Sequence, residues 1–154
     1  MLAHDPRRIL HFHVTAHPTA EWPAQQLREA FPWDAAPRCL LRDRIFGDDF
    51  VEQVKAMGIK EVLSARRSPW QRAYVERLIG SIRRECPDHV MVFNEASLRR
   101  ILSSYIDHYH HTRTHLSLWK DAPESRPVQR PGSGRIVAIP QVGGLYYRYE
   151  RRVA

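Results

Sequence analysis

The amino-acid sequence predicts an α/β fold with a partly parallel sheet, from two observations. Short apolar runs of strand type alternate, in the first half of the chain, with segments whose apolar residues recur at helical spacing. Turn signals separate these segments, so that helices join successive strands, as parallel pairing requires. The length of 154 residues allows one domain with a modest core, and the 43% hydrophobic content disfavours wholesale disorder.

The first three elements follow from local patterns. Residues 8–15 alternate apolar with polar side chains, which is typical of a half-buried strand. Thr19 is a suitable N-cap for a helix over residues 19–31, whose apolar side chains form one stripe. The run 38–42 predicts a short buried strand that ends at Asp43.

The next three elements continue the alternation. Asp48 or Asp49 can cap a helix that Gly58 stops. Residues 59–63 predict another short strand. The helix over residues 68–82 is the best defined, because proline suits its first turn and its apolar residues recur at i, i+3, i+4 and i+7.

The second half of the chain predicts a core helix and a tail. Apolar residues line one face of a helix over residues 94–109. The tail, residues 121–154, starts as a linker rich in proline, arginine and glycine and ends in a small β-hairpin of 135–139 with 145–149. Residues 1–120 are therefore expected to form the main domain.

Several protein classes are disfavoured by the sequence. No apolar run approaches the roughly 20 residues that span a bilayer, and the N-terminus lacks the apolar segment of a signal peptide. Cys39 and Cys86 lie far apart without a CxxC pair, which argues against a disulfide framework and against a zinc knuckle. These features favour a cytoplasmic protein with no membrane partner.

The net charge of +7 is carried almost entirely by arginine, whose guanidinium binds phosphate oxygens in pairs. Arginines and aromatic residues gather around the helix over residues 68–82, a mixture that suits a groove that follows phosphates and stacks bases. In the alternative interpretation, Trp70 and Tyr74 belong to the core and the arginines are merely solvated. The candidate nucleic-acid-binding residues are Arg66, Arg67, Trp70, Arg72, Arg83 and Arg84.

Asp43 and Glu76 are the candidate metal-binding pair. Asp43 ends a predicted strand, where α/β sheets hold their ligands, and Glu76 lies at the edge of a helical apolar stripe. Two converging carboxylates suit a hard divalent cation. The alternative is an ordinary surface ion pair, because Arg72 lies four residues before Glu76.

Histidines 108, 110, 111 and 115 follow one another near the end of the helix over residues 94–109. They suggest a zinc site, but no cysteine lies nearby, and a polar helix end is the favoured interpretation. The sequence contains no nucleophile elbow, Walker loop or dinucleotide fingerprint.

Four segments carry motifs that are specific as a set. They are Leu41–Arg44, Ser68–Arg77, Ile82–Glu85 and Tyr109–Leu118, the last followed by Asp121–Pro123. In this order they resemble the integrase core of bacterial DDE transposases, and Tyr109–Leu118 is similar to the family's Tyr-Asn-x-x-Arg-x-His-x-x-Leu signature. The resemblance covers most of the chain, from Ile9 to Pro127.

The resemblance implies a ribonuclease H-like fold, a mixed sheet flanked by helices. It implies DNA integration or transposition, in which two Mg²⁺ (or Mn²⁺) ions bound by three carboxylates activate a nucleophile for attack on DNA phosphate. Asp43 matches the second carboxylate and Glu76 the third, so both become candidate catalytic residues. DNA is the implied partner, together with further copies of the chain in a homo-oligomer.

Departures from the family pattern predict a truncated, inactive catalytic domain. The family's first aspartate lies on the first strand, and we expect this chain to lack both. Only 32 residues separate Asp43 from Glu76, fewer than is usual in the family. Arg72 and His110 stand where the family has asparagine. We therefore expect Mg²⁺ or Mn²⁺ to bind weakly.

One main hypothesis and two alternatives follow. The main hypothesis is a DDE transposase or integrase catalytic domain that remains from a longer mobile-element protein. The first alternative is a non-catalytic DNA-binding or interaction module built on the same scaffold. The second is a metal-dependent nuclease that uses only two carboxylates.

Overall fold

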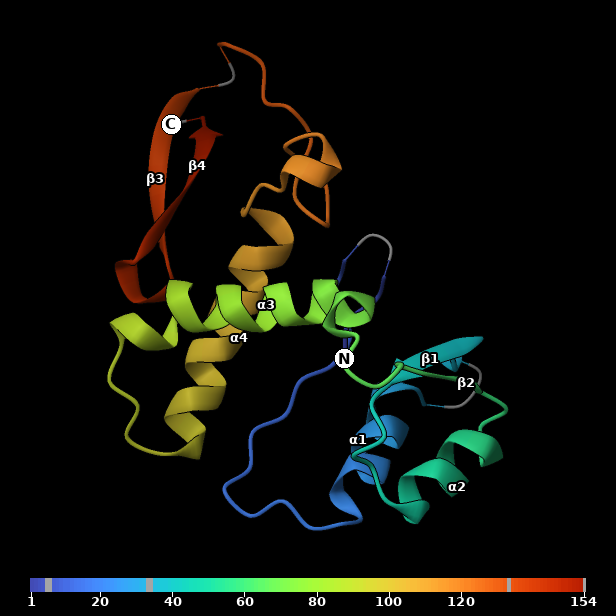
Figure 1. Cartoon of the computed structure of the whole chain (residues 1–154). Coiled ribbons are helices and arrows are strands. Elements are labelled where there is room, and N and C mark those ends of the chain that lie inside the picture. The colour runs from blue at the N-terminus through green and yellow to red at the C-terminus, as the bar shows by residue number, and fades with distance from the viewer. Residues whose placement is uncertain (5–6, 33–34, 133, 154) are drawn as a thin grey trace. The chain divides into compact units, whose positions relative to one another are not determined.

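The computed structural model of the chain describes residues 1–4, 7–32, 35–132 and 134–153. The chain divides into two compact units (Figure 1). The first unit consists of Leu10–Arg77 with Met1, and the second of Leu78–Ala154 with Leu2–Ile9. The helix α3 crosses from one unit to the next.

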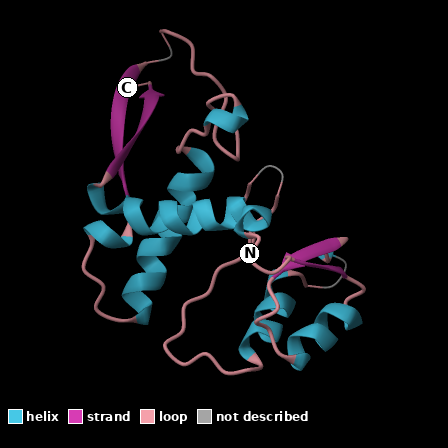
Figure 2. Cartoon of the chain, viewed as in Figure 1, coloured by secondary structure: helices cyan, strands magenta, loops and turns pink. Residues whose placement is uncertain are grey.

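The described residues form α-helices and two small sheets, which confirms the predicted α/β class (Figure 2). In chain order the elements are α1 Trp22–Ala30, β1 Cys39–Arg42, α2 Asp48–Ala56, β2 Lys60–Leu63, α3 Ala73–Glu85, α4 Glu95–His111, β3 Arg135–Gln141 and β4 Tyr146–Arg152. A short 3-10 helix, Pro69–Arg72, leads directly into α3. The sheets are separate pairs, β1 with β2 and β3 with β4, so a single ribonuclease H-like mixed sheet stays a prediction.

The first unit is built on a strand–helix–strand element. β1 and β2 pair in parallel with Cys39 opposite Lys60, and α2 connects them, as the sequence predicts. α2 begins at Asp48 with Gly47 as its N-cap, and Gly58 follows it with a φ of +67°. The core lies between α1, α2 and one face of the strands; its buried members are Leu27, Phe31, Phe50, Val54 and Ile59.

The prediction that β1 is buried is wrong. Leu41 is exposed, and so is Val62, its partner across the parallel pair. Side chains alternate between the two faces of a strand, and only the face that carries Leu40 packs against the core. On that face Arg42 is buried, and its guanidinium donates hydrogen bonds of 2.9 and 2.5 Å to Glu61.

Residues 8–15 do not form the predicted strand. Ile9 makes a single antiparallel bridge with Leu2, and the residues after it have no regular secondary structure. An alternating pattern gives a segment two distinct faces, but a strand also needs a neighbouring strand with which to pair. In the described structure, Leu2 is the residue that supplies this pairing. The predicted N-cap of the first helix is also wrong. α1 begins at Trp22, so its N-cap is Glu21 and not Thr19, and the Glu21 side chain makes no capping hydrogen bond.

In the second unit, α3 and α4 pack around a separate core. α4 starts with a capping box, in which the Asn94 side chain accepts a hydrogen bond from Ser97 N and Ser97 Oγ accepts one from Asn94 N. The buried members of this core are Ile9, Cys86, Tyr105, Tyr109 and Val142. Leu78 and Ile82 of α3 pack against it, whereas Ile79 of the predicted apolar stripe is exposed.

The predicted C-terminal hairpin is present and longer than expected. β3 and β4 pair antiparallel from Arg135 opposite Arg152 to Gln141 opposite Tyr146. At the turn, Val142 N donates a hydrogen bond of 3.2 Å to Ser104 Oγ of α4. The turn of the hairpin therefore contacts α4. The predicted division of the chain into two regions at residue 120 stays a prediction.

Candidate active centre and nucleic-acid interface

Asp43 and Glu76, the candidate catalytic residues, lie near the same arginine in the first unit. Asp43 follows β1, and its Oδ1 accepts a hydrogen bond of 2.7 Å from Arg44 N. Glu76 lies in the first turn of α3, where the helix dipole favours negative charge. Arg72 is the last residue of the 3-10 helix, immediately before α3. The sequence thus correctly predicted both backbone positions, a strand end and a helix.

The guanidinium of Arg72 connects the two carboxylates. Its Nη1 lies 2.7 Å from Asp43 Oδ2, and its Nη2 lies 3.8 Å from Glu76 Oε1. The side chains of Asp43, Arg72 and Glu76 are 40%, 31% and 53% exposed. Arg72 Nε is buried and has no hydrogen-bond partner in the described structure. The ion pair between Arg72 and Glu76 is therefore present, but the shorter contact is the one to Asp43.

This arrangement does not fit a divalent cation while Arg72 holds its place. Carboxylate oxygens are suitable ligands for Mg²⁺ or Mn²⁺, but a positive guanidinium already binds one oxygen of Asp43 and faces Glu76. In the described ranges of the chain, no three His, Cys, Asp or Glu side chains are grouped so that they could hold a metal ion. The geometry therefore presents two carboxylates neutralised in part by an internal cation.

The candidate nucleic-acid-binding residues of the first unit are largely on the surface. Arg66 and Arg67 are exposed in the turn after β2, and Trp70 is 69% exposed. Tyr74, at the start of α3, is 39% exposed. The alternative that Trp70 belongs to the core is wrong, because the 3-10 helix presents its ring to solvent. These side chains offer both cations for phosphate and a ring for base stacking.

Arg83 and Arg84 lie in the part of α3 that belongs to the second unit, and both are exposed. Arg83 Nε lies 3.8 Å from Asp88 Oδ1, a loose surface ion pair in which the Arg83 side chain is 80% exposed. Within the described residues, Arg84 has no carboxylate partner. Its guanidinium lies over Gly80, where a Cβ atom would come within 3.0 Å of Nη1. Both arginines are thus available to an anionic partner.

Sequence reasoning missed a network centred on Glu85, at the end of α3. Arg113 binds it with two hydrogen bonds, Nε to Oε2 at 2.7 Å and Nη2 to Oε1 at 2.5 Å. The Tyr105 hydroxyl donates to Oε2 at 2.7 Å, and the Tyr146 hydroxyl donates to the Glu85 backbone oxygen at 2.8 Å. The network joins α3, α4, the segment after α4, and β4. The sequence offered one signal for this network: Glu85 and Arg113 lie in two of the segments that resemble the transposase family.

The network fixes the charge state of Glu85. Burial raises the pKa of this carboxyl, but the hydrogen bonds from Arg113 and Tyr105 outweigh burial, so that the pKa lies below its usual value. Burial and the adjacent carboxylate raise the pKa of Tyr105, which keeps the hydroxyl protonated as a donor. Glu85 and Arg113 therefore remain an ion pair at neutral pH.

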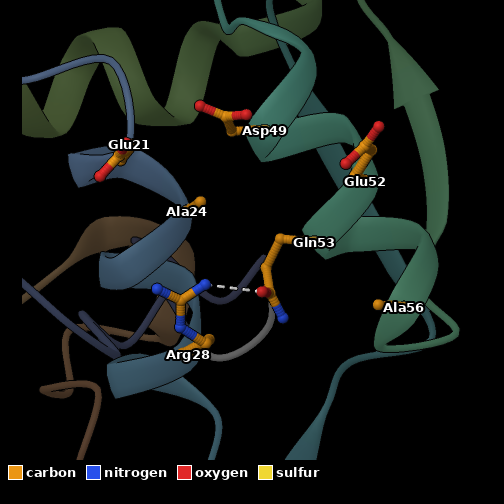
Figure 3. Close-up of a pocket in the computed structure, with 7 residues that line it drawn as sticks. All are labelled: Glu21, Ala24, Arg28, Asp49, Glu52, Gln53 and Ala56. Carbon is orange, nitrogen blue, oxygen red and sulfur yellow. Dashed lines mark hydrogen bonds between the residues drawn. The ribbon is translucent and has the colours of Figure 1, made fainter.

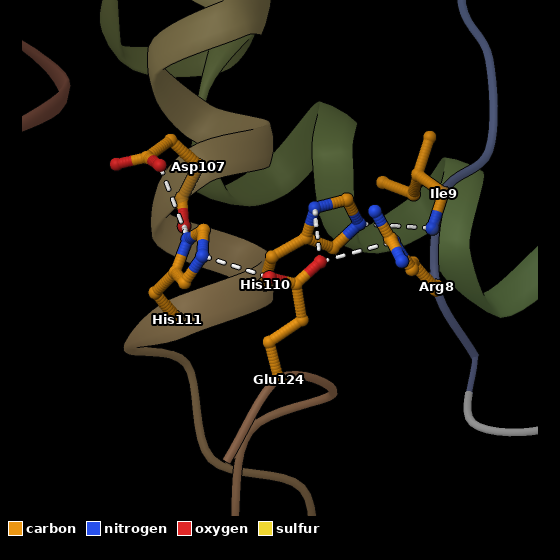
Figure 4. Close-up of polar contacts among 6 residues, drawn as sticks. All are labelled: Arg8, Ile9, Asp107, His110, His111 and Glu124. Atoms are coloured by element: carbon orange, nitrogen blue, oxygen red, sulfur yellow. Dashed lines mark hydrogen bonds and ion pairs between the residues drawn. The ribbon is translucent and has the colours of Figure 1, made fainter. Parts of the chain in front are cut away.

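Two histidines of α4, His110 and His111, take part in polar contacts around its C-terminus (Figure 4). His110 Nε2 accepts a hydrogen bond of 2.9 Å from the backbone N of Ile9. His111 lies between two carboxylates, with Nδ1 3.1 Å from Asp107 and Nε2 2.9 Å from Glu124. Burial lowers the pKa of His110, so that its neutral form can accept from Ile9. These contacts link α4 to the first residues of the unit and to the segment after α4.

His108 and His115 pack against aromatic rings in the second unit. The His108 ring stacks on Tyr146, with a centroid distance of 4.5 Å, and His115 meets the edge of Tyr109 at 4.8 Å. Burial lowers the pKa of His108. Burial, together with the charge of Arg113, lowers the pKa of His115 to about 4. The lowered pKa values favour the neutral form of both rings, and His115 Nδ1 also lies 3.2 Å from Arg113 Nη1, from which a neutral ring can accept a hydrogen bond.

A cleft lies between α1 and α2 in the first unit (Figure 3). Glu21, Asp49 and Glu52 make its lining acidic, and Arg28 donates a hydrogen bond of 2.7 Å to Gln53 across it. An acidic lining repels a polyanion, so this cleft is not part of the predicted DNA-binding surface.

Within the described residues, no helix is long and apolar enough to cross a membrane.

The comparisons with known proteins connect these features to one family. Residues 57–123, somewhat less than half of the chain, match the integrase core domain family. No curated protein and no solved structure matches the chain. Glu76 and the segment Tyr109–Leu118 lie inside the matched range, and Asp43 lies before it. The match indicates a function related to DNA integration or transposition, and it shows that residues 57–123 are similar to the catalytic core of integrases and transposases.

Proposed function

We propose that this chain binds DNA without sequence preference as an integrase-type protein, and that it catalyses little or no strand transfer while Arg72 pairs with Asp43. The family match supports a role in DNA integration or transposition. The observation that carries the proposal is the surface position of Arg66 and Arg67 in the same segment of the first unit as the exposed ring of Trp70.

DNA binding is supported by charge and exposure together. Arg66 and Arg67 are exposed near Trp70, and Arg83 and Arg84 are exposed on α3. Guanidinium groups that contact phosphates release condensed counterions, which makes affinity fall as salt rises. An exposed aromatic side chain can stack on any base and so adds affinity without sequence preference.

The ion pair of Arg72 supports weak catalysis. A carboxylate that neutralises a guanidinium is a poorer ligand or base than a free one, because part of its charge is already compensated. Asp43 and Glu76 are nevertheless the two carboxylates that the integrase-type motifs mark. We propose that Asp43 and Glu76 correspond to two of the catalytic carboxylates of the family.

Salt-dependent binding to a short labelled duplex tests the DNA proposal. Fluorescence anisotropy at several salt concentrations gives the slope of log affinity against log salt for the protein and for two double variants, R66A/R67A and R83A/R84A. Each variant is expected to weaken binding and to reduce the slope by about 2, since each arginine that contacts a phosphate contributes about 1.

The matched control is R99A/R100A, which removes the same charge from an exposed arginine pair on α4. This control is expected to change the slope much less than either test variant. Equal effects of all three would show that binding follows net charge alone, and salt-independent binding would refute the proposal.

A second candidate function, strand transfer itself, is favoured by the presence of Glu76 inside the family match. Joining of a labelled oligonucleotide 3′ end to a plasmid, with Mg²⁺ or Mn²⁺ present, tests it. Product that appears with the protein and disappears in D43N and in E76Q would establish this function in place of the non-catalytic one. Absence of product at saturating DNA is the expected result.

A further inference from the structure

We infer that Arg72 is an internal counter-ion that competes with a divalent cation for Asp43 and Glu76, and that its removal opens a Mg²⁺- or Mn²⁺-binding site. The inference concerns only these carboxylates and stands apart from DNA binding. It starts from two observations that conflict. The carboxylate oxygens of Asp43 and Glu76 suit a divalent cation, but the guanidinium of Arg72 already contacts both side chains.

The contacts show how the competition would operate. Arg72 Nη1 is 2.7 Å from Asp43 Oδ2, so a metal ion that binds this oxygen must displace the guanidinium. Asp43 Oδ1 accepts a hydrogen bond from Arg44 N, so that both oxygens of this carboxylate have a partner, and Oδ2 is the one that loses its partner when Arg72 is removed. Glu76 is 3.8 Å from Arg72 and more than half exposed, so it is held only loosely.

The local charge points the same way. Two carboxylates and one guanidinium sum to −1, whereas the carboxylates alone sum to −2. At equal distance and dielectric constant a net charge of −2 attracts a divalent cation about twice as strongly as −1, and the difference is the repulsion by the guanidinium. Removal of the arginine therefore improves the charge of the site and also leaves Asp43 Oδ2 without its 2.7 Å contact.

The guanidinium is displaceable because it is incompletely held. Its Nε is buried without a hydrogen-bond partner in the described structure, so this donor contributes nothing to retention. Arg113, in contrast, uses both Nε and Nη2 on the same carboxylate. Arg72 has one short contact and one long one, which a ligand of higher charge can exchange for its own.

A Mn²⁺ titration without DNA tests the inference. Electron paramagnetic resonance measures free Mn²⁺ in the presence of the whole chain, as the wild type and as R72Q. Mn²⁺ is expected to bind R72Q at least about tenfold more tightly than the wild type, because a repulsive charge has been removed from the site. In R72Q/D43N and R72Q/E76Q the gain is expected to disappear.

R77Q is the matched control. Arg77 is exposed one residue after Glu76, and in the described structure it makes no ion pair with Asp43 or Glu76. R77Q is therefore expected to change the Mn²⁺ affinity less than twofold. An equal gain in R72Q and R77Q would show a general charge effect and overturn the inference, as would no gain in R72Q.

Circular dichroism checks that each variant is folded, and R72M replaces R72Q if the latter is not. A gain that survives in R72Q/D43N would assign the cation to other ligands and would also overturn the inference. Because no DNA is present, none of these results depends on whether the DNA-binding proposal holds.

Discussion

Two arginine–carboxylate groups, one in each unit, use the same chemistry under different conditions. In the second unit, Arg113 binds Glu85 with two short hydrogen bonds, and both side chains are about one-quarter exposed. In the first unit, Arg72 has one short contact to Asp43 and a long one to Glu76, and the carboxylates are about half exposed.

The difference shows that pairing alone does not reveal the role of a charged group. Glu85 has its oxygens occupied by Arg113 and Tyr105, so no ligand atom is left for a partner from solution. The Glu76 side chain is 53% exposed, and its contact with Arg72 is 3.8 Å long. The closed group stabilises the fold, and the open group is available to ligands. Each prediction below tests one side of this distinction.

The largest effect is expected from E85A in the closed group. The change leaves Arg113 without its carboxylate and Tyr105 without an acceptor, both in a partly buried position. The free energy of opening of α4 should fall by about 2–3 kcal/mol, since hydrogen bonds to charged groups contribute at this level. Hydrogen exchange of the α4 amides measures it in this unit alone.

The exposed pair of Arg83 and Asp88 supplies the control for that result. D88A breaks a contact of 3.8 Å between side chains that are 80% and 50% exposed, and it should change the same free energy by less than about 0.5 kcal/mol. If E85A has no larger effect than D88A, the Glu85 network does not stabilise the second unit.

A smaller effect is expected from pH, through His115 beside the closed group. Burial and Arg113 lower its pKa to about 4, so between about pH 6.5 and pH 4 the unfolded chain binds a proton that the folded chain does not. Stability should therefore be complete above pH 6.5 and fall as the pH drops to 4, by about 1–2 kcal/mol after solvent screening.

H115Q tests the assignment, because glutamine does not titrate. In H115Q, the free energy of opening of α4, measured by hydrogen exchange at several pH values, should depend on pH less steeply than in the wild type. Part of the slope remains, since burial also lowers the pKa values of His108 and His110. An unchanged slope would remove His115 from the account.

The sequence was sufficient for the elements whose signals are local. The strand–helix–strand element of the first unit, the helix α4 and the C-terminal hairpin each follow from short patterns. The exposure of one face of β1 did not follow, because burial depends on which face other elements cover. Leu40 and Leu41 are equivalent in sequence, yet only Leu40 packs against the core.

The candidate site also combines features that local sequence patterns predict with contacts that they do not predict. Positions for Asp43 and Glu76 were predictable from a strand end and a helix, and the contact of Arg72 with Glu76 from their spacing of four. The contacts of Arg72 with Asp43 and of Arg113 with Glu85 join distant segments, and no local pattern encodes them. Tertiary packing decides which arginine meets which carboxylate.

A still smaller effect on stability than that of pH is expected from breaking the open group. R72Q should lower the free energy of unfolding of the first unit by less than about 1 kcal/mol, because solvent screens half-exposed ion pairs and side-chain entropy opposes them. Even this difference should shrink as salt is added. Urea unfolding at low and high salt, compared with hydrogen exchange of the β1 and β2 amides, measures it.

R113Q provides the comparison that decides between the two groups. It should destabilise the second unit by more than R72Q destabilises the first, and with less dependence on salt, because the partly buried pair is screened less. If R72Q is as damaging as R113Q, Arg72 is a structural residue and its contact with Asp43 is not open to exchange. A small effect of R72Q combined with a gain in Mn²⁺ affinity is the result that only an exchangeable counter-ion produces.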